Sequence, residues 1–339
     1  MSELLKKLCS AFGPSSMEDE VRDIIIEEIK PYATSYRVDK TGNLIVFKKG
    51  KKERQNKLLF SAHMDEVGFM VRHIDEDGFI YFGTVGGIDR RVISGKRVVI
   101  GENRIPGVIC GKAIHIQKPE ERGVAPIIEK MFIDIGSVSK EDTLKYVKVG
   151  DLVTFEPNFE TFGDYKIKSK AIDDRFGCYM LCELIKQDLE YDTYFAFVIM
   201  EEEGCRGAMN VAFSEKADEV VVVEATTAGD IHGSPESGKA CELGKGAVLS
   251  FMDNGTVYSP KVLQKLISIC EENNIKFQIK NLVAGGNDAS AYQRIYYPTK
   301  VAAISAPVRY IHSATSVADQ RDFDEIKKLL ELVAANGIA

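Results

Sequence analysis

The chain has 339 residues, of which 45% are hydrophobic and 28% are charged, a composition typical of globular proteins. Its formal net charge is −7 and it carries no basic cluster, which argues against nucleic acid as a partner. No apolar run approaches the length that spans a membrane, and residues 1–13 lack the apolar core of a signal peptide, so we expect a cytoplasmic protein without a membrane partner.

The first part of the chain predicts two helices, over 4–11 and 18–29, and the second ends before a proline. Ser15 and Ser16 offer an N-cap for the second helix, and Glu18 stands three residues after Ser15, which is the spacing of a capping box. Two short strand patterns with a Lys-Thr-Gly turn between them then predict a hairpin over 35–47.

A buried strand is expected over 57–62, and it runs directly into His63 and Asp65. From residue 67 to residue 163, short strand-like runs alternate with glycine and aspartate turns, and long helical periods are nearly absent. Evenly spaced short strands of this kind predict a small all-β barrel or sandwich. We therefore divide the chain into a larger α/β domain, residues 1–66 and 164–339, and an inserted β domain, residues 67–163.

After residue 170 the α/β pattern returns. Three buried strands are expected here: one runs into Glu201, Glu202 and Glu203, one ends at Glu224, and one leads towards His312. Helices are expected over 175–187, 208–214, 259–273 and 323–335, and strands over 194–200, 219–223, 247–251, 276–279 and 301–305. One further helix should follow a glycine turn, with Asp288 as its N-cap rather than as a catalytic group.

Histidines and carboxylates thus follow four predicted buried strands, and Asp173 lies in a loop before a helix. In open α/β sheets, ligands bind outside the carboxyl ends of the strands, so we expect these side chains to converge. Unpaired buried carboxylates are costly, and a bound metal cluster would compensate their charge. The alternatives are a solvent-exposed acidic turn at Glu201–Glu203 and histidines with ordinary buried partners.

The seven cysteines form no Cys-x-x-Cys pair, and most have apolar neighbours, so we expect reduced core thiols. Two histidines and several carboxylates without a nearby cysteine suit zinc, cobalt or manganese. One carboxylate can bridge two such ions, and a spare glutamate beside a ligand can act as general base.

Five motifs, in this order, resemble those of the tetrahedral (TET) dinuclear-metal aminopeptidases. This group includes glutamyl and deblocking aminopeptidases, and some members carry the label endoglucanase. The resemblance spans nearly the whole chain, and no single motif would establish it. The motifs are SAHMDEVGF (61–69), AIDDRFG (171–177), EEEGCRGA (201–208), GGNDA (285–289) and IHS (311–313).

The resemblance implies a zinc-peptidase-like α/β/α sandwich with a mixed sheet, plus the inserted small all-β barrel. It also implies a metal-dependent aminopeptidase that hydrolyses short peptides. The barrel would mediate dimerisation, and the dimers would assemble into a homo-oligomeric, tetrahedral dodecamer.

The resemblance further implies a role for each of seven side chains. Glu201 would be the general base, Asp65 would orient His63, and the peptide between Asp173 and Asp174 would be cis. The family usually has aspartate at position 224, and glutamate reaches further. The ligands of two divalent ions, zinc or cobalt or else manganese, would be His63 and Glu224 on one, Glu202 and His312 on the other, and Asp173 as the bridge.

Two other functions stay open at this point. An endoglucanase or cellulase-type glycosidase, as some family labels state, would need two opposed carboxylates and usually no metal. A non-catalytic metal-binding homologue is the second, and glutamate in place of aspartate at position 224 is the feature that supports it.

Overall fold

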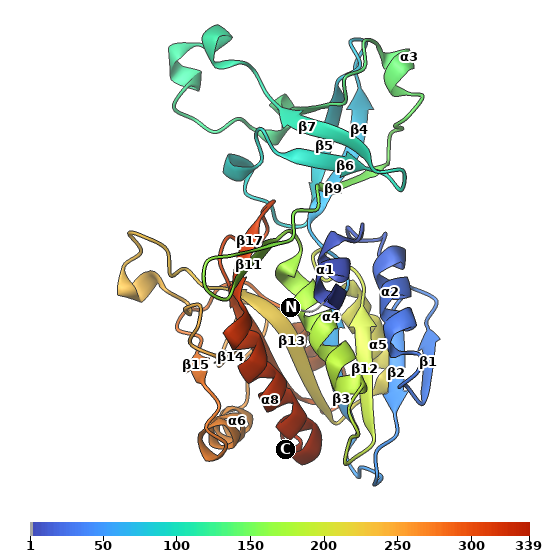
Figure 1. Ribbon diagram of the computed structural model, residues 1–339, viewed down its shortest axis with the longest axis vertical. Helices are drawn as coiled ribbons and strands as arrows, with labels where there is room; N and C mark the ends of the chain where they lie inside the picture. Colours follow the sequence, from blue (N-terminus) through green and yellow to red (C-terminus); the bar gives the residue numbers. More distant parts are fainter. Residues whose placement is uncertain (1–2) are drawn as a thin grey trace.

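The computed structural model describes residues 3–339, and its centre is an eight-stranded mixed sheet (Figure 1). The four middle strands pair in parallel, whereas both outer pairs include antiparallel neighbours. In spatial order, the strands are β1 (Ser35–Val38), β2 (Leu44–Lys48), β12 (Thr193–Val198), β3 (Leu58–His63), β13 (Glu219–Thr227), β16 (Lys300–Val308), β14 (Ala247–Leu249) and β15 (Phe277–Ile279).

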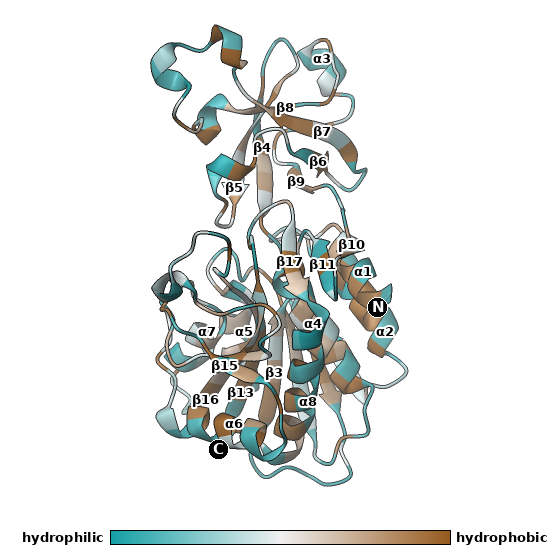
Figure 2. Cartoon of the chain, turned by 60° about the vertical axis from the view of Figure 1, so that its left-hand side comes forward, coloured by the Kyte–Doolittle hydropathy of each residue, from teal (hydrophilic) through white to brown (hydrophobic). Residues whose placement is uncertain are grey.

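Helices cover both faces of the sheet because its central strands are apolar on both sides. Alternate residues of β13 divide between two cores: Val221 and Val223 pack on one face, and Val220 and Val222 on the other. The hydrophobic colouring accordingly gathers between the helices (Figure 2). The first face carries α1 (Glu3–Ser10), α2 (Asp19–Ile29), α4 (Ile172–Ile185), α6 (Pro260–Glu272) and α8 (Gln320–Asn336), and the second carries α5 (Arg206–Glu215) and α7 (Ala289–Arg294).

A closed six-stranded antiparallel barrel stands above the sheet in Figure 1, and it is inserted in sequence between β3 and the rest of the α/β part. Its own core includes Phe69, whose ring meets those of Phe82 and Phe155 edge-on at centroid distances of 5.0 and 5.4 Å. Closure leaves no free strand edge, and it confirms the all-β barrel expected from the turn spacing. The strands are β4 (Gly68–Ile74), β5 (Ile80–Val85), β6 (Arg97–Ile100), β7 (Ile105–Cys110), β8 (Phe132–Asp134) and β9 (Leu152–Phe155).

A small third sheet, which the sequence analysis did not predict, lies between the barrel and the large sheet (Figure 1). Its middle strand pairs with β17, which lies about 150 residues further along the chain, so no local pattern shows the pairing. The strands are β10 (Glu160–Phe162), β11 (Lys166–Ser169) and β17 (Ser316–Asp319). The remaining short elements are the helix α3 (Lys140–Thr143) and 3-10 turns at Arg90–Val92, Ile114–Ile116, Pro119–Glu121, Ile128–Lys130 and Glu236–Gly238.

A buried charge cluster connects the barrel to the α/β part. Glu66 accepts hydrogen bonds from Lys170 Nζ at 2.6 and 2.7 Å, from Arg175 Nη2 at 3.1 Å, and from the hydroxyl of Thr154 on β9 at 2.8 Å. Lys170 and Arg175 are themselves fully buried. Because buried charges require partners, this cluster fixes the end of β3 against both β9 and α4.

Two local predictions are wrong. Ser15 does not cap α2: its hydroxyl donates to Asp65 Oδ2 at 2.7 Å, and α2 begins at Asp19 without a side-chain cap. A buried carboxylate is a stronger acceptor, and only the folded chain brings it there. Glu224 does not end its strand either, because β16 pairs with β13 as far as Thr227.

Within residues 3–339, no helix combines the length and the apolar character that crossing a bilayer requires.

Candidate metal centre

The structure brings all seven predicted site residues to one place, at the barrel-facing edge of the large sheet. The carboxyl ends of the parallel strands β3, β12 and β16 lie at this edge, where ligands bind in open α/β sheets. The residues are His63 at the end of β3, Asp65 two positions later, Asp173 at the start of α4, Glu201 and Glu202 after β12, Glu224 within β13, and His312 after β16.

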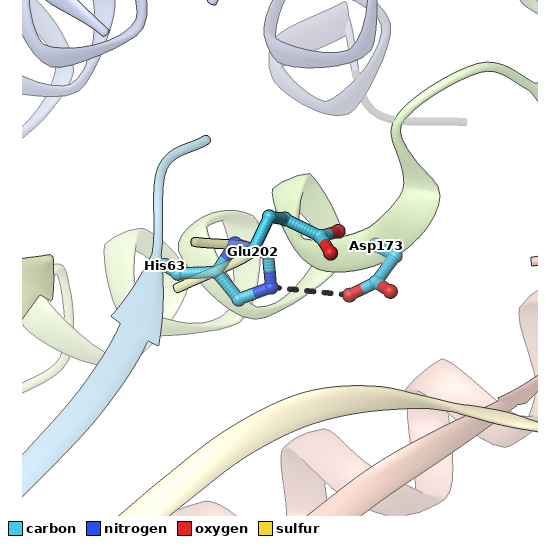
Figure 3. Close-up of side chains that lie close together, drawn as sticks. All are labelled: His63, Asp173 and Glu202. Carbon is cyan, nitrogen blue, oxygen red and sulfur yellow. Dashed lines mark hydrogen bonds and ion pairs between the residues drawn. The ribbon is translucent and has the colours of Figure 1, made fainter. Parts of the chain in front are cut away.

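Asp173 lies at the centre, between the two histidines. Its Oδ1 is 3.2 Å from His63 Nε2, and its Oδ2 is 3.0 Å from His312 Nε2. Figure 3 shows the carboxylates of Asp173 and Glu202 close to the ring of His63, with the interaction between His63 and Asp173 drawn as a dashed line. The two carboxylate oxygens of Asp173 therefore belong to two different clusters.

Each histidine also faces a glutamate of its own. His63 Nε2 is 3.3 Å from Glu224 Oε1, and His312 Nε2 is 3.2 Å from Glu202 Oε1. The result is two sets of one histidine and one glutamate, joined by a shared aspartate. The peptide bond between Asp173 and Asp174 is cis, as the resemblance implied.

The second ring nitrogen of each histidine faces a backbone carbonyl. His63 Nδ1 is 3.1 Å from the carbonyl oxygen of Asp65, and His312 Nδ1 is 2.9 Å from that of Gly87. When Nδ1 carries the proton and donates it to this carbonyl, Nε2 is free to act as a ligand. Gly87 lies in the connection after β5, so the inserted segment contributes directly to the site.

The acidic side chains of the site are buried, and burial shifts their pKa values. Burial raises the pKa of Glu224 to about 8, and it also raises the pKa of Glu201 and of Glu202. Burial acts in the same direction on Asp173, but hydrogen bonds from His312 and His63 outweigh it and hold that pKa below its usual value. So many acids in one buried place are stable only with positive charge beside them.

Several buried carboxylate oxygens at this place lack a hydrogen-bond partner within residues 3–339: Glu202 Oε1, Glu224 Oε2 and both oxygens of Asp288. Leaving such atoms unpaired costs stability, and a divalent cation would satisfy those of Glu202 and Glu224. Imidazole nitrogens and carboxylate oxygens at these distances form a set that suits zinc, cobalt or manganese. The residues present therefore fit a metal centre.

Asp65 organises the residues around this centre. Its Oδ1 is 3.2 Å from His63 Nδ1, and its two oxygens accept the backbone N–H groups of Glu201 and Glu202 at 3.0 and 3.2 Å. Ser15 donates the further hydrogen bond described above. These contacts hold the turn after β12 against the end of β3, so that Glu201 and Glu202 face the two histidines.

A cavity of about 370 Å³ opens beside the cluster and is lined by Asp173, Glu201 and Glu224. Glu201 faces this cavity without approaching either histidine as a partner, which separates it from Glu202 and Glu224. Its Oε1 is 3.6 Å from Cys205 Sγ. The carboxylate of Glu201 therefore lies at the cavity wall, next to the side chains that are suited to hold cations.

Asp288 was predicted to be a helix cap, and its position at the N-terminus of α7 is as expected. Its side chain makes no capping hydrogen bond, is fully buried and lies in a cluster with Glu201 and Cys205. Burial raises the pKa of Asp288 to about 7. An aspartate after a glycine turn looks the same in the sequence whether it caps a helix or is a buried acid. Only the folded chain distinguishes the two.

Known proteins resemble this chain over almost its full length. The model of the M42 glutamyl aminopeptidase family matches residues 42–329. A putative aminopeptidase of Acetivibrio thermocellus is 38% identical over 333 residues, which is 97% of each chain. The lysyl aminopeptidase of Pyrococcus furiosus is 30% identical over 338 residues, covering 96% of this chain and 94% of that protein.

Solved structures agree with these matches. The TET aminopeptidase of Thaumarchaeota archaeon SCGC AB-539-E09 superposes with a TM-score of 0.93 at 31% identity, covering 99% of this chain and 98% of that one. The TET1 peptidase of Pyrococcus horikoshii, which can assemble into a tetrahedron or a large octahedral shell, gives 0.87 at 34% identity over 98% of each chain. The dodecameric structure PhTET1-12s gives 0.87 at 35% identity over 99% of each chain.

Proposed function

Because this chain belongs to the M42 glutamyl aminopeptidase family, and is thus an aminopeptidase and a hydrolase, we propose that it releases amino-terminal residues from short peptides by metal-assisted hydrolysis. The observation that carries this proposal is the position of Asp173. Its two oxygens face two histidines, and each histidine has a glutamate of its own.

Five side chains would hold two divalent cations. His63 and Glu224 would bind the first, Glu202 and His312 the second, and Asp173 would be shared by both. Zinc and cobalt suit this set best, and manganese is the third candidate. When bound, the two cations supply Lewis-acid polarisation of the scissile carbonyl and make a water molecule acidic enough to attack it.

Glu201 would be the general base. It lies at the cavity wall, next in sequence to the ligand Glu202, and its carboxylate is not paired with either histidine. The carboxylate would take a proton from the attacking water and then deliver it to the amine that leaves. Asp65 would act through others, since it holds His63 and the backbone of Glu201 in place.

The proposal is tested by removing the metal. Treatment with a chelator is expected to abolish hydrolysis of alanyl- and leucyl-p-nitroanilide, because the side chains of the site cannot replace the cations in activating water and the scissile carbonyl. Reloading with zinc, cobalt or manganese should restore the activity. The same anilides with an acetylated amino group should stay intact, because an aminopeptidase requires a free amino terminus. Release of p-nitroaniline measures both results.

Two outcomes would favour the alternatives raised by the sequence. Hydrolysis of cellulose substrates that persists in the presence of chelator would indicate a glycosidase. A chain that binds two equivalents of cation but cleaves no aminoacyl anilide would be a non-catalytic homologue.

We further propose that residues 67–163 form an assembly domain, that residues 1–66 and 164–339 form the catalytic domain, and that the chain builds a twelve-subunit particle. Support comes from the similar TET structures, which include a dodecamer and a tetrahedron. Light scattering is expected to give a mass of about 450 kDa, twelve times that of the 37.6 kDa chain. A stable monomer or dimer at micromolar concentration would contradict this proposal. The cytoplasmic location stays a prediction from the sequence.

A further inference from the structure

One buried acid near the site is not explained by the two-ion arrangement. Asp288 is fully buried, and neither of its side-chain oxygens has a hydrogen-bond partner within residues 3–339. It lies beside the carboxylate of Glu201 and the thiol of Cys205, and one ligand atom from each of the three lies within 4.8 Å of the other two. Because an unpaired buried carboxylate is costly, this place favours a positively charged occupant.

A tight turn brings Glu201 and Cys205 together. The backbone N–H groups of Gly204 and Cys205 both donate to the carbonyl oxygen of Glu201, each at 2.9 Å. Cys205 has a left-handed backbone conformation, with a φ of 55°, and α5 begins directly after it. The thiol consequently faces Glu201, and Cys205 Sγ lies 3.6 Å from Glu201 Oε1. Two of the three ligand atoms therefore come from one short, well-fixed segment.

The third ligand atom comes from another element, the amino-terminal end of α7. Asp288 directly precedes this helix, and Ser290, the second residue within it, donates to Cys205 Sγ at 3.9 Å. The helices α5 and α7 pack in the same hydrophobic core, on one face of the large sheet. Helix packing therefore fixes Asp288 relative to Cys205.

The spacing of these atoms suits a tetrahedral ion. Zinc binds thiolate sulfur at about 2.3 Å and carboxylate oxygen at about 2.1 Å, so a tetrahedral angle places the two ligand atoms about 3.6 Å apart. The distance from Cys205 Sγ to Glu201 Oε1 is 3.6 Å, and across it the thiol of the metal-free protein donates to the carboxylate. A thiolate among the ligands favours zinc over manganese.

We propose that Glu201, Cys205 and Asp288 form a third cation site, which takes zinc and other thiophilic divalent ions. The site shares no side chain with the five proposed ligands of the first two ions. Binding forms a bond between the ion and Cys205 Sγ, and the thiol proton passes to solvent. Because the ion would occupy the carboxylate of Glu201, excess zinc should inhibit hydrolysis, a consequence that rests on the proposed function.

The first test counts bound zinc by equilibrium dialysis of the whole chain against excess zinc. Wild type should bind one equivalent more than Cys205→Ser, because a serine hydroxyl is not among the usual ligands of zinc. Asp288→Asn, whose amide carries no charge, should lose the same equivalent. The matched control is Cys110→Ser in the barrel, which should bind as much as wild type: Cys110 and Cys205 are the two partly exposed thiols, and the other five are buried.

Cadmium shows the thiolate directly, because a cadmium–thiolate bond absorbs in the ultraviolet. Cadmium is added to protein that carries two equivalents of zinc. The absorption band should appear in wild type and in Cys110→Ser, and it should be absent in Cys205→Ser.

Inhibition is measured with leucyl-p-nitroanilide, relative to the activity of each variant at two equivalents of zinc. The zinc concentration for half-inhibition should rise by at least about 100-fold in Cys205→Ser, because losing a direct ligand costs more than the roughly 10- to 100-fold of losing its hydrogen-bond partner. Excess manganese should not inhibit manganese-loaded wild type, since manganese binds thiolate poorly.

Three results would overturn the inference. Equal zinc binding by wild type and Cys205→Ser would exclude the site, and a cadmium band that persists in Cys205→Ser would assign the thiolate to another cysteine. Equal inhibition of the two proteins by zinc would place the inhibitory ion elsewhere. If wild type cleaves no anilide, the proposed function fails, and the zinc count and the cadmium band still decide whether the third site exists.

Discussion

Replacing Glu201 by glutamine is expected to lower kcat by about 10²- to 10⁴-fold, the usual contribution of a positioned general base. The amide has almost the same shape, but it does not accept the proton of the attacking water. Because Glu201 does not face either histidine, both cations should still bind. Anilide hydrolysis measures the turnover, and elemental analysis of the dialysed protein measures the bound metal.

The matched control for this substitution is Glu203→Gln, two positions further along the same turn. Glu203 is exposed and accepts a hydrogen bond from the backbone N–H of Gly86 at 2.7 Å, outside the cavity. It should retain normal turnover. If Glu201→Gln has the turnover of the wild type, another group must act as the base.

Replacing Asp173 by asparagine is expected to remove both cations, and with them the activity. Asp173 lies within ion-pair distance of both histidines, so its loss affects both clusters at once. The fall in metal affinity should exceed the roughly 10- to 100-fold that is typical when the lost residue only forms a hydrogen bond to a metal ligand.

Thermal unfolding gives an independent measure of the same change. A cation at 100 times its dissociation constant stabilises the folded protein by about 2.7 kcal/mol, and in wild type this should raise Tm. The rise should be absent in Asp173→Asn and present in Asp164→Asn, a control at an exposed position. An Asp173→Asn protein that keeps two equivalents of cation would refute the shared-ligand assignment.

The local sequence pattern was sufficient for most of the fold. The apolar run before Glu201 predicts a strand buried on both faces, and β12 lies in the middle of the large sheet. The change of texture after residue 67 likewise predicts the barrel. Such patterns predict the elements correctly because the burial of alternate or successive side chains requires a regular spacing of apolar residues in the sequence. This spacing is the same whichever distant segments pack against the element.

The rule that functional groups gather at the carboxyl ends of parallel strands was sufficient to group most of the site. It predicts the convergence of His63, Glu202 and His312, although about 250 residues separate the first from the last. The resemblance then supplied the roles. Glu224 was misplaced at the end of β13 because the apolar run stops at Val223, whereas pairing with β16 continues as far as Thr227.

Which partner each polar side chain takes was decided only by the tertiary structure. Ser15 has the spacing of a cap but donates to Asp65, and Asp288 has the position of a cap but is buried beside Glu201. Whether a side chain is buried can be predicted from the hydrophobic periodicity of its neighbours in the sequence. Its hydrogen-bond partner depends instead on how segments far apart in the chain are packed together. The sequence by itself therefore determined the elements and the list of reactive groups, and packing decided which of those groups face one another.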